Sequence, residues 1–544
     1  MKPFEINDAF RPAAVELRQR AVQGAGITLL SGGVGLAIQV IATVVLARLL
    51  TPADFGRVAM VTAFSQLFMN FGLNGLTEAV VQQDEVTHDQ ASSLFWINLG
   101  AGFLLTIGFA FAGSLLARFY HDPKVAHVAV GLSLTILLTS VSVLHLALLK
   151  RAMRFADVSF NDVYARIVSV IVSVVFGLAG WGYWALVLGT VALPLTTAIG
   201  AWFMCRWVPG RPRQIAATGS MIRFAIHIYG RFSLGYFTNN LDNFLVGWRL
   251  GPTPLGFYKK AYDLFALPSN QLSTRLTIVA VSALSRLRQD SGQYKRYFLG
   301  ALGVMAFVGL GLSADLTLIG KDLILVLLGP KWAESGRIFT LFGPGIGFML
   351  LYCTHVWLHI SLGRADRWFR WGIVDLIVTT VFLLVGLRWH AEGIAVAWVA
   401  SYWIITLPAL WYAGRPIQLG ISSVIAVIWR YVLASLIAGG ATFLIARAIP
   451  SLGAGSGALW AFGRIVVVSA LFAGVYLGTV ISLHRGCAPL NRLAELFREM
   501  TSRGKFSRPV AGSEQVVHGF EGLQQEVLAA TEISRRGLDE IAKV

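Results

Sequence analysis

The sequence predicts an all-α polytopic membrane protein with about 14 transmembrane helices, from its composition, its apolar segments and an internal repeat. Of the 544 residues, 56% are hydrophobic and only 13% are charged, and the mean hydropathy is +0.66. A soluble core could not bury that much apolar surface, so the bilayer must be the solvent. A helical span needs about 20 mainly apolar residues. Such segments begin near residues 24, 57, 91, 125, 157, 181, 222, 257, 296, 336, 371, 392, 427 and 458.

An internal repeat becomes visible when the chain is compared with itself at an offset of 200 residues. The matching pairs are Leu50 and Leu250, Pro52 and Pro252, Gly56 and Gly256, Gly35 and Gly235, Gln39 and Asn239, and Asn70 and Asn270. Six matches in one register indicate a duplication rather than chance. Duplicated sets of membrane helices with polar residues at matching depths are typical of transporters whose substrate site lies between the two halves.

The repeat divides the chain into two six-helix lobes, followed by two C-terminal helices and a soluble tail. We expect a cytoplasmic N-terminal segment at 1–23, an N-lobe at 24–205, a cytoplasmic linker at 206–221, a C-lobe at 222–413, two further spans at 427–483 and a cytoplasmic tail at 484–544. In the tail, Leu493, Phe497 and Met500 recur at helical spacing, which predicts amphipathic helices. These would lie on the membrane or on each other, or dock to a partner of the same pathway.

Charge and motif content exclude several functions. The formal net charge is +17, but the basic residues are spread over many short loops, so we expect contact with lipid headgroups and no nucleic acid partner. The excess of Lys and Arg on one side places both termini in the cytoplasm. The three cysteines share no CxxC spacing, and no phosphate loop, zinc-type His spacing or nucleophile elbow is present. We therefore expect no metal, no cofactor, no catalytic residue and an ion gradient as the energy source.

Polar residues within the predicted spans mark the candidate transport pathway, because a charge in a span is costly and usually functional. The seventh span is the richest. His227, Arg231 and Asp242 share one helix face, which Asn239 widens. Arg231 and Asp242 are about 16 Å apart along a helix, too far for a direct ion pair, so each needs water, substrate or a partner on another span.

The second, fifth and eighth spans carry the remaining candidates. These are Asn70, Asn74 and Glu78, then Asp162 and Arg166, then Asp263, Asn270 and Arg275. A cavity bordered by Arg231, Arg166 and Arg275 would attract a doubly anionic group such as a pyrophosphate, because guanidinium binds phosphate through paired hydrogen bonds. Asp242 and Glu78 would instead bind and release H⁺ or Na⁺. The alternative is that these charges pair with one another or reach the headgroups.

Four segments, in this order, resemble those of a known family. They read Leu-Thr-Pro-Ala-Asp-Phe-Gly at 50–56, Asp-Asn-Phe-Leu-Val-Gly at 242–247, Ala-Leu-Ser-Arg-Leu at 283–287 and Gly-Pro-Lys-Trp at 329–332. Together with the repeat, they resemble the Wzx-type oligosaccharide flippases of bacterial lipopolysaccharide and exopolysaccharide synthesis. That group belongs to the multidrug/oligosaccharidyl-lipid/polysaccharide exporter superfamily, and the resemblance covers roughly residues 20–480.

The resemblance implies two six-helix lobes in the bacterial inner membrane, which expose a cationic cavity to each side in turn. The substrate would be an undecaprenyl pyrophosphate-linked oligosaccharide, moved from the cytoplasmic to the periplasmic leaflet. Arg231 would contact the pyrophosphate. Partners would be membrane lipids and, in the same pathway, a polysaccharide polymerase and a chain-length regulator.

Two other functions are alternatives to that of a flippase. A multidrug or cation antiporter of the same superfamily would need a more acidic cavity than one that offers Arg231 as readily as Asp242. A membrane-embedded polysaccharide polymerase, ligase or glycosyltransferase would need a sizeable outer loop or an acidic catalytic pair near the membrane face. None of the predicted outer loops is long, which counts against an enzyme.

Overall fold

The helices in the computed structural model follow the order of the predicted spans. The structure describes residues 14–82, 86–211, 236–237, 240–449, 455 and 457–486. Within these ranges every regular element is helical, and ten segments are long and apolar enough to cross a membrane. The prediction of an all-α, multi-pass membrane protein is confirmed. The seventh span lies mostly outside the described residues, so the count of fourteen stays a prediction.

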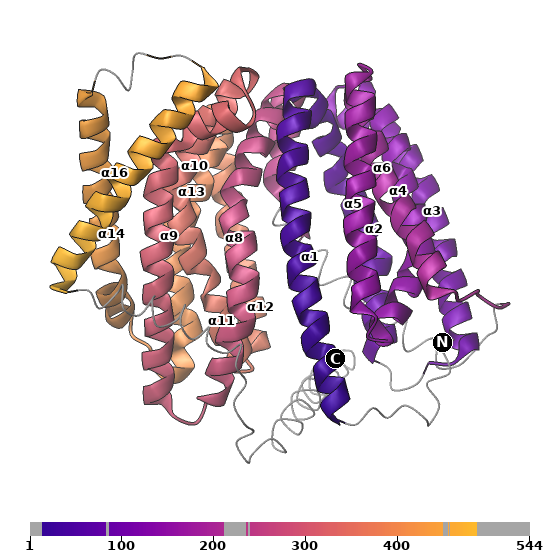
Figure 1. The fold of residues 1–544 in the computed structure, drawn as a ribbon, viewed down its shortest axis with the longest axis horizontal. Helices are drawn as coiled ribbons and strands as arrows, with labels where there is room; N and C mark the ends of the chain where they lie inside the picture. The colour runs from indigo at the N-terminus through magenta and orange to yellow at the C-terminus, as the bar shows by residue number, and fades with distance from the viewer. Residues whose placement is uncertain are drawn as a thin grey trace, which may run out of the picture. The chain divides into compact units, whose positions relative to one another are not determined.

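The N-lobe contains six helices grouped on one side of the molecule (Figure 1). They are α1 (Ala14–Leu49), α2 (Pro52–Gln82), α3 (His88–Tyr120), α4 (Lys124–Arg151), α5 (Phe155–Leu178) and α6 (Tyr183–Cys205). Helix α4 is the central one, because it packs against α2, α3 and α6. Helix α1 begins at Ala14, within the segment expected to precede the first span, because its helix continues past the apolar residues into polar ones.

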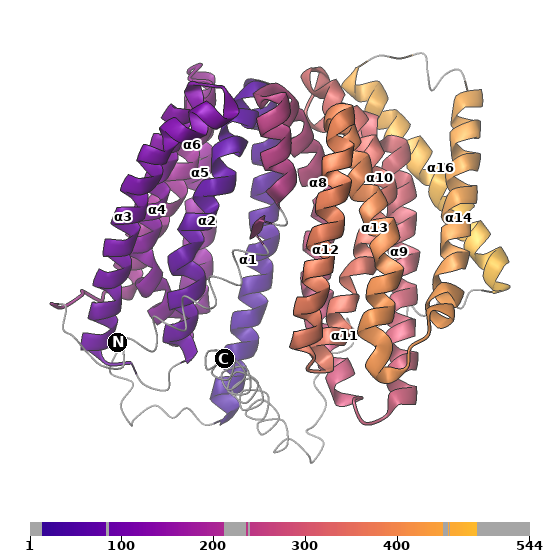
Figure 2. The same ribbon diagram turned by 180° about the vertical axis from the view of Figure 1, so that it is seen from behind.

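The C-lobe is built around α10 (Figure 2). Its elements are α8 (Pro252–Arg286), α9 (Ser291–Leu327), the short η1 (Pro330–Trp332), α10 (Ala333–Cys353), α11 (His355–Ser361), α12 (Ala365–Gly386), η2 (Leu387–Trp389), α13 (His390–Gly414) and η3 (Arg415–Ile417). Helix α10 packs against α8, α9 and α13. The tenth predicted span is interrupted at Thr354, where α10 ends and α11 begins.

Two further helices, α14 (Ile421–Ala448) and α16 (Ala458–His484), pack on each other and on α9. An ion pair joins α16 to α9, because Arg464 Nε donates to Asp322 Oδ2 at 3.1 Å and a second guanidinium nitrogen donates to Oδ1. Ser469 of α16 also donates to Asp315 of α9. Polar contacts between side chains therefore attach this helix pair to the C-lobe.

The start of the predicted linker belongs to the N-lobe. Trp207 donates its indole N–H to His88, and the backbone N–H of Gly210 donates to Ser92 at 2.9 Å. Trp96 in turn donates to the carbonyl of Gly210. Residues 207–210 are therefore fixed to α3, and His145 of α4 lies 3.2 Å from the carbonyl oxygen of Trp207.

Contacts between the two lobes involve residues 47–64 and 119–120 of the N-lobe and residues 244–260 and 326–332 of the C-lobe, which we call the closed end. Here the first turns of α2 and α8 cross so closely that a Cβ at Gly56 would lie 1.7 Å from the carbonyl oxygen of Pro252. A Cβ at Gly256 would lie 1.9 Å from the carbonyl oxygen of Pro52. These four residues are the ones that the offset of 200 pairs, and a reciprocal contact is what a two-fold relation between the matching segments would produce.

Candidate functional site

The structure describes five of the predicted candidates in full. These are Asp162, Arg166, Asp242, Asp263 and Asn270. Three others, His227, Arg231 and Asn239, lie outside the described residues. Four more lie in described helices, but their side chains are outside the described part: Asn70, Asn74 and Glu78 in α2, and Arg275 in α8. The cluster of Arg231, Arg166 and Arg275 therefore stays a prediction, because Arg166 alone among the three has a described side chain.

Asp242 lies inside the C-lobe and is fully buried. Its carboxylate accepts hydrogen bonds from the Tyr258 hydroxyl at 2.6 Å, the Trp398 indole N–H at 3.2 Å and the backbone N–H of Asn243 at 2.8 Å. Three donors compensate for the water that a buried carboxylate loses. Asp242 therefore links the end of the seventh span to α8 and α13 and lies within the lobe.

Arg166 lies on α5, which packs against α1, and Asn270 lies on α8, which packs against α2 of the opposite lobe. Arg166 donates to Asp162 at 2.9 Å, one turn earlier on α5. The aliphatic part of its side chain lies beside Gly35 of α1, with Cδ 3.5 Å from where a Cβ would be. Asn270 is exposed on α8. The ion pair matches the alternative in which span charges pair with each other, and both ends of it remain partly exposed.

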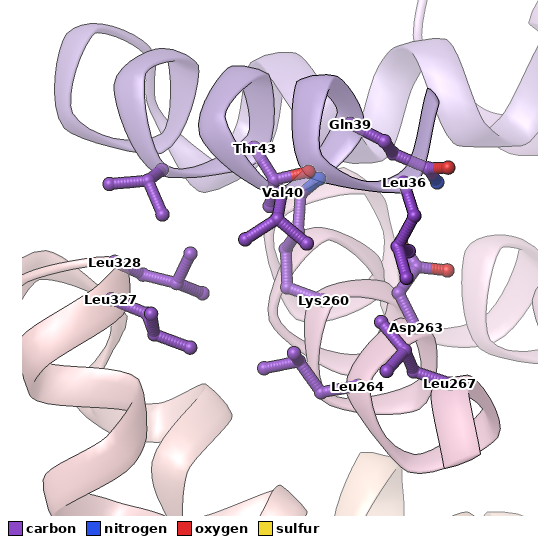
Figure 3. A pocket seen from close by; sticks show the side chains of 11 residues that line it. Leu36, Gln39, Val40, Thr43, Lys260, Asp263, Leu264, Leu267, Leu327 and Leu328 are labelled. Atoms are coloured by element: carbon purple, nitrogen blue, oxygen red, sulfur yellow. The ribbon is translucent and has the colours of Figure 1, made fainter. Parts of the chain in front are cut away.

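A pocket of about 70 Å³ opens between the lobes, among α1, α8 and the end of α9 (Figure 3). Its volume would hold a few water molecules, far less than a sugar. Leucine and valine side chains form most of its wall, together with four polar residues. These are Gln39 and Thr43 on α1, and Lys260 and Asp263 on α8.

Lys260 is a candidate residue that the sequence analysis did not select. Its side chain reaches from α8 towards Thr43 of α1 in Figure 3, and its ammonium lies 4.1 Å from the centroid of the Phe55 ring on α2. The neighbouring Lys259 instead pairs with Asp263 at 2.8 Å. Successive residues on a helix point about 100° apart, so one lysine is neutralised on α8 while the other faces the opposite lobe. Two adjacent lysines inside a predicted span were the available signal.

The Gly-Pro-Lys-Trp segment at 329–332 fastens the C-lobe to the end of α1. Gly329 has a φ of +94°, which reverses the chain after α9, and the following η1 buries Trp332 completely. The Trp332 indole N–H donates to the carbonyl of Ala47 at 2.8 Å, and the Lys331 ammonium donates to the carbonyl of Arg48 at 3.2 Å. The last carbonyls of a helix lack donors within it, so donors from the opposite lobe satisfy two of them.

The arrangement suits a transporter that opens one end at a time. Contacts between the lobes gather at the closed end, and the polar pocket lies beside them. Within the described residues, no group of three or more His, Cys, Asp or Glu side chains could hold a metal ion. The chemistry available between the lobes is an ammonium, a carboxylate and two neutral polar groups, of which the ammonium can bind an anion and the others can form hydrogen bonds with a polar ligand.

Comparison with known proteins agrees with this architecture. The chain is similar to the succinoglycan biosynthesis transport protein ExoT of Rhizobium meliloti (strain 1021), with 22% identity over 355 residues, 65% of this chain and 72% of that protein. It is also similar to the lipopolysaccharide biosynthesis protein WzxC of Escherichia coli (strain K12), with 20% identity over 324 residues, 58% of this chain and 65% of that protein.

Solved structures show the same fold. The lipid II flippase MurJ, in an inward closed conformation, matches with a TM-score of 0.67 and 13% identity, covering 85% of this chain and 99% of that chain. A multidrug resistance MATE family transporter of the MOP superfamily, in an inward-facing conformation, matches with a TM-score of 0.58 and 11% identity, covering 71% of this chain and 94% of that chain. The family model described as polysaccharide biosynthesis protein matches residues 45–337. Because this match spans more than half of the sequence, the chain belongs to the polysaccharide biosynthesis protein family.

Proposed function

We propose that this protein is a flippase that moves an undecaprenyl pyrophosphate-linked oligosaccharide from the cytoplasmic to the periplasmic leaflet of the bacterial inner membrane. Family membership and the names of the relatives support a role in building surface polysaccharide. The fold shared with a lipid II flippase supports a lipid-linked substrate. The observation that carries the proposal is an ammonium that lines a pocket between the two lobes, beside the contacts of the closed end.

Transport would proceed by alternating access. The charge distribution supports a cytoplasmic N-terminus, and in that orientation α1 would run outward and the closed end would face the periplasm. In this state the pathway would open towards the cytoplasm, where the substrate is made. Separation of the lobes at the closed end would then release the oligosaccharide to the periplasmic side.

Cationic side chains would bind the pyrophosphate. Lys260 supplies one charge from the C-lobe, and Arg166 would supply another from the N-lobe after exchanging its bond to Asp162 for the substrate. Arg231 and Arg275 complete the set in our proposal, because guanidinium binds phosphate through paired hydrogen bonds. Gln39 and Thr43 would bind sugar hydroxyls near the lipid-linked end.

A cation would supply the energy. Asp242 is a candidate for coupling to H⁺ or Na⁺, with Glu78 as a second, because its carboxylate sits where α8 and α13 meet the end of the seventh span. A proton on this carboxylate would change the bonds to Tyr258 and Trp398, and so the packing of three helices. Catalysis has no part in this proposal, and a polymerase and a chain-length regulator would act on the product.

Replacing Arg231 by Ala should abolish surface polysaccharide while the protein level in the membrane stays unchanged. Replacing Lys260 by Gln should reduce it. The substrate would then accumulate on the cytoplasmic leaflet, where externally added enzymes cannot reach it. The matched control is Arg447→Ala, which removes an exposed guanidinium from the last turn of α14.

Normal export by Arg231→Ala would contradict the pyrophosphate role. An antiporter would behave differently in the same strains. Deletion of the gene would then raise sensitivity to cationic drugs and leave the lipid-linked oligosaccharide evenly accessible from outside. Extraction of undecaprenyl-linked sugars, with and without external hydrolase, distinguishes the two functions.

A further inference from the structure

We propose that Lys260 couples anion binding to the opening of the closed end, by exchanging the Phe55 ring for a phosphate of the ligand. This inference rests on the proposed function, because it assigns a second role to one of the groups that would bind pyrophosphate. Lys260 belongs to the C-lobe and Phe55 to the N-lobe, so the contact between them holds the lobes together. Breaking it removes one of the bonds between them.

Of the two adjacent lysines on α8, Lys259 and Lys260, the second contacts the opposite lobe. The ammonium of Lys259 lies 2.8 Å from Asp263 on the same helix, so a carboxylate already neutralises it. The ammonium of Lys260 is 4.1 Å from the centre of the Phe55 ring. It also lines the pocket between the lobes, which places it within reach of a ligand that enters there.

Phe55 belongs to the contacts that keep the closed end together. Its ring meets the Trp332 ring edge to face, with centroids 5.4 Å apart. Trp332 in turn donates to the carbonyl of Ala47. Lys260 and Trp332 both contact the Phe55 ring, so these side chains link α8, α2, η1 and α1 in one cluster. Loss of the Lys260 contact therefore weakens this cluster.

An anion and the Phe55 ring compete for the same ammonium. An ammonium binds a phosphate oxygen more strongly than a ring face, because the former bond is charge-assisted. While the end is closed, the anion has to displace the ring. Once the end opens, Phe55 leaves with the N-lobe and Lys260 is available. The anion therefore binds the open state more tightly.

A ligand shifts a conformational equilibrium by the ratio of its affinities for the two states. Here that ratio is set by the cation–π contact, which corresponds to a factor of roughly 2 to 30. Binding of the pyrophosphate group would therefore raise the open-to-closed ratio by this factor. By reciprocity, loss of the ring should raise the affinity of the closed state for the anion by the same factor.

The test measures the distance between the lobes by electron paramagnetic resonance in the full-length protein. Spin labels are placed at A179C, after α5, and R388C, in η2, both of which are exposed near the closed end. The native cysteines are first replaced, and the protein is placed in nanodiscs of phosphatidylethanolamine and phosphatidylglycerol. Inorganic pyrophosphate is the probe, because it carries the proposed anionic group without the lipid or the sugar.

Pyrophosphate should increase the long-distance population of the wild-type background by roughly 2- to 30-fold. Lys260→Gln should abolish this response. Phe55→Leu should show the long-distance population without pyrophosphate and bind pyrophosphate more tightly by the same factor. Lys260→Arg, which keeps the cation, should retain the response and shows that the site still folds. Lys321→Gln removes an exposed lysine elsewhere on α9 and should respond as the wild type does.

An unchanged response in Lys260→Gln would overturn the inference, as would a Phe55→Leu protein that matches wild type in both distance and affinity. Flipping of the lipid-linked oligosaccharide is measured separately in vesicles of the same lipids. If flipping does not depend on Lys260 or Phe55, the coupling is wrong and the proposed function still holds. A pyrophosphate response without flipping supports the coupling and contradicts the proposed function.

Discussion

Gly56→Ala should force the closed end apart, because the added methyl group has no space there. A Cβ at residue 56 would lie 1.7 Å from the carbonyl oxygen of Pro252 and 2.6 Å from its carbonyl carbon. Both are backbone atoms, so no side chain can turn away. An ordinary carbon-to-oxygen contact needs at least about 3.3 Å, so the first turns of α2 and α8 must separate by roughly 1.6 Å.

That separation would break hydrogen bonds between the lobes. Trp332 donates to Ala47 at 2.8 Å and Arg48 donates to Val326 at 2.9 Å, and both would pass the limit of about 3.2 Å for such bonds. Each is worth about 0.5–1.5 kcal/mol, so the closed state would lose about 1–3 kcal/mol. The open-to-closed ratio would rise by roughly 5- to 150-fold.

The distance between labels at A179C and R388C measures this ratio directly. Gly300→Ala on α9 is the matched control, because a Cβ there would meet nothing within 4 Å. Gly256→Ala is the reciprocal variant, with a Cβ 1.9 Å from the carbonyl oxygen of Pro52. One separation relieves both clashes, so the double variant should shift the ratio by less than the two single effects combined. A distance distribution of Gly56→Ala that equals the wild type would refute this reasoning.

Two predictions concern the C-terminal part of the chain. Asp322→Asn should lower the stability of the purified protein by about 2 kcal/mol, because it leaves the largely buried Arg464 guanidinium without its carboxylate. Thermal unfolding followed by tryptophan fluorescence measures this, and a double replacement of both residues by Leu should recover part of the loss; equal stability of Asp322→Asn and wild type would contradict it. Removing residues 488–544 should leave polysaccharide export largely intact, because the tail follows the last predicted span; a complete loss of export would make the tail part of the mechanism.

Helix positions could be predicted from the sequence because they depend on local properties. Apolar length sets a span, and a Gly-Pro step begins a helix, as at Gly251 and Pro252 before α8. The offset of 200 also placed Gly56 and Gly256 at equivalent positions, since both follow a proline at the start of a helix. In the structure, each of these two glycines lies against the backbone of the proline that begins the other helix.

Side-chain partners could not be predicted in the same way, because they depend on contacts far apart in the chain. Helical periodicity predicts that Asp242 lies on a polar helix face. It does not predict which residues of other helices contact that face. Trp398, a partner of Asp242, is 156 residues away. Lys260 was missed for a related reason: Asp263 is close enough along α8 to pair with either lysine. Only the position of Phe55 on the opposite lobe separates their roles.

The polarity of α2 and α8 follows from their place between the lobes. Neither is among the ten described segments that are apolar enough to cross a membrane by composition, yet each lies among helices that are, and the two pack against each other. A helix that faces lipid all round must be apolar, whereas a helix that faces a second lobe and a partly polar pocket can carry charges such as Lys259, Lys260 and Asp263. The offset of 200 pairs the start of α2 with the start of α8. Low hydropathy in two paired spans therefore predicts helices that face the opposite lobe, and we propose that α2 and α8 are walls of the transport pathway because they combine this position with charged residues.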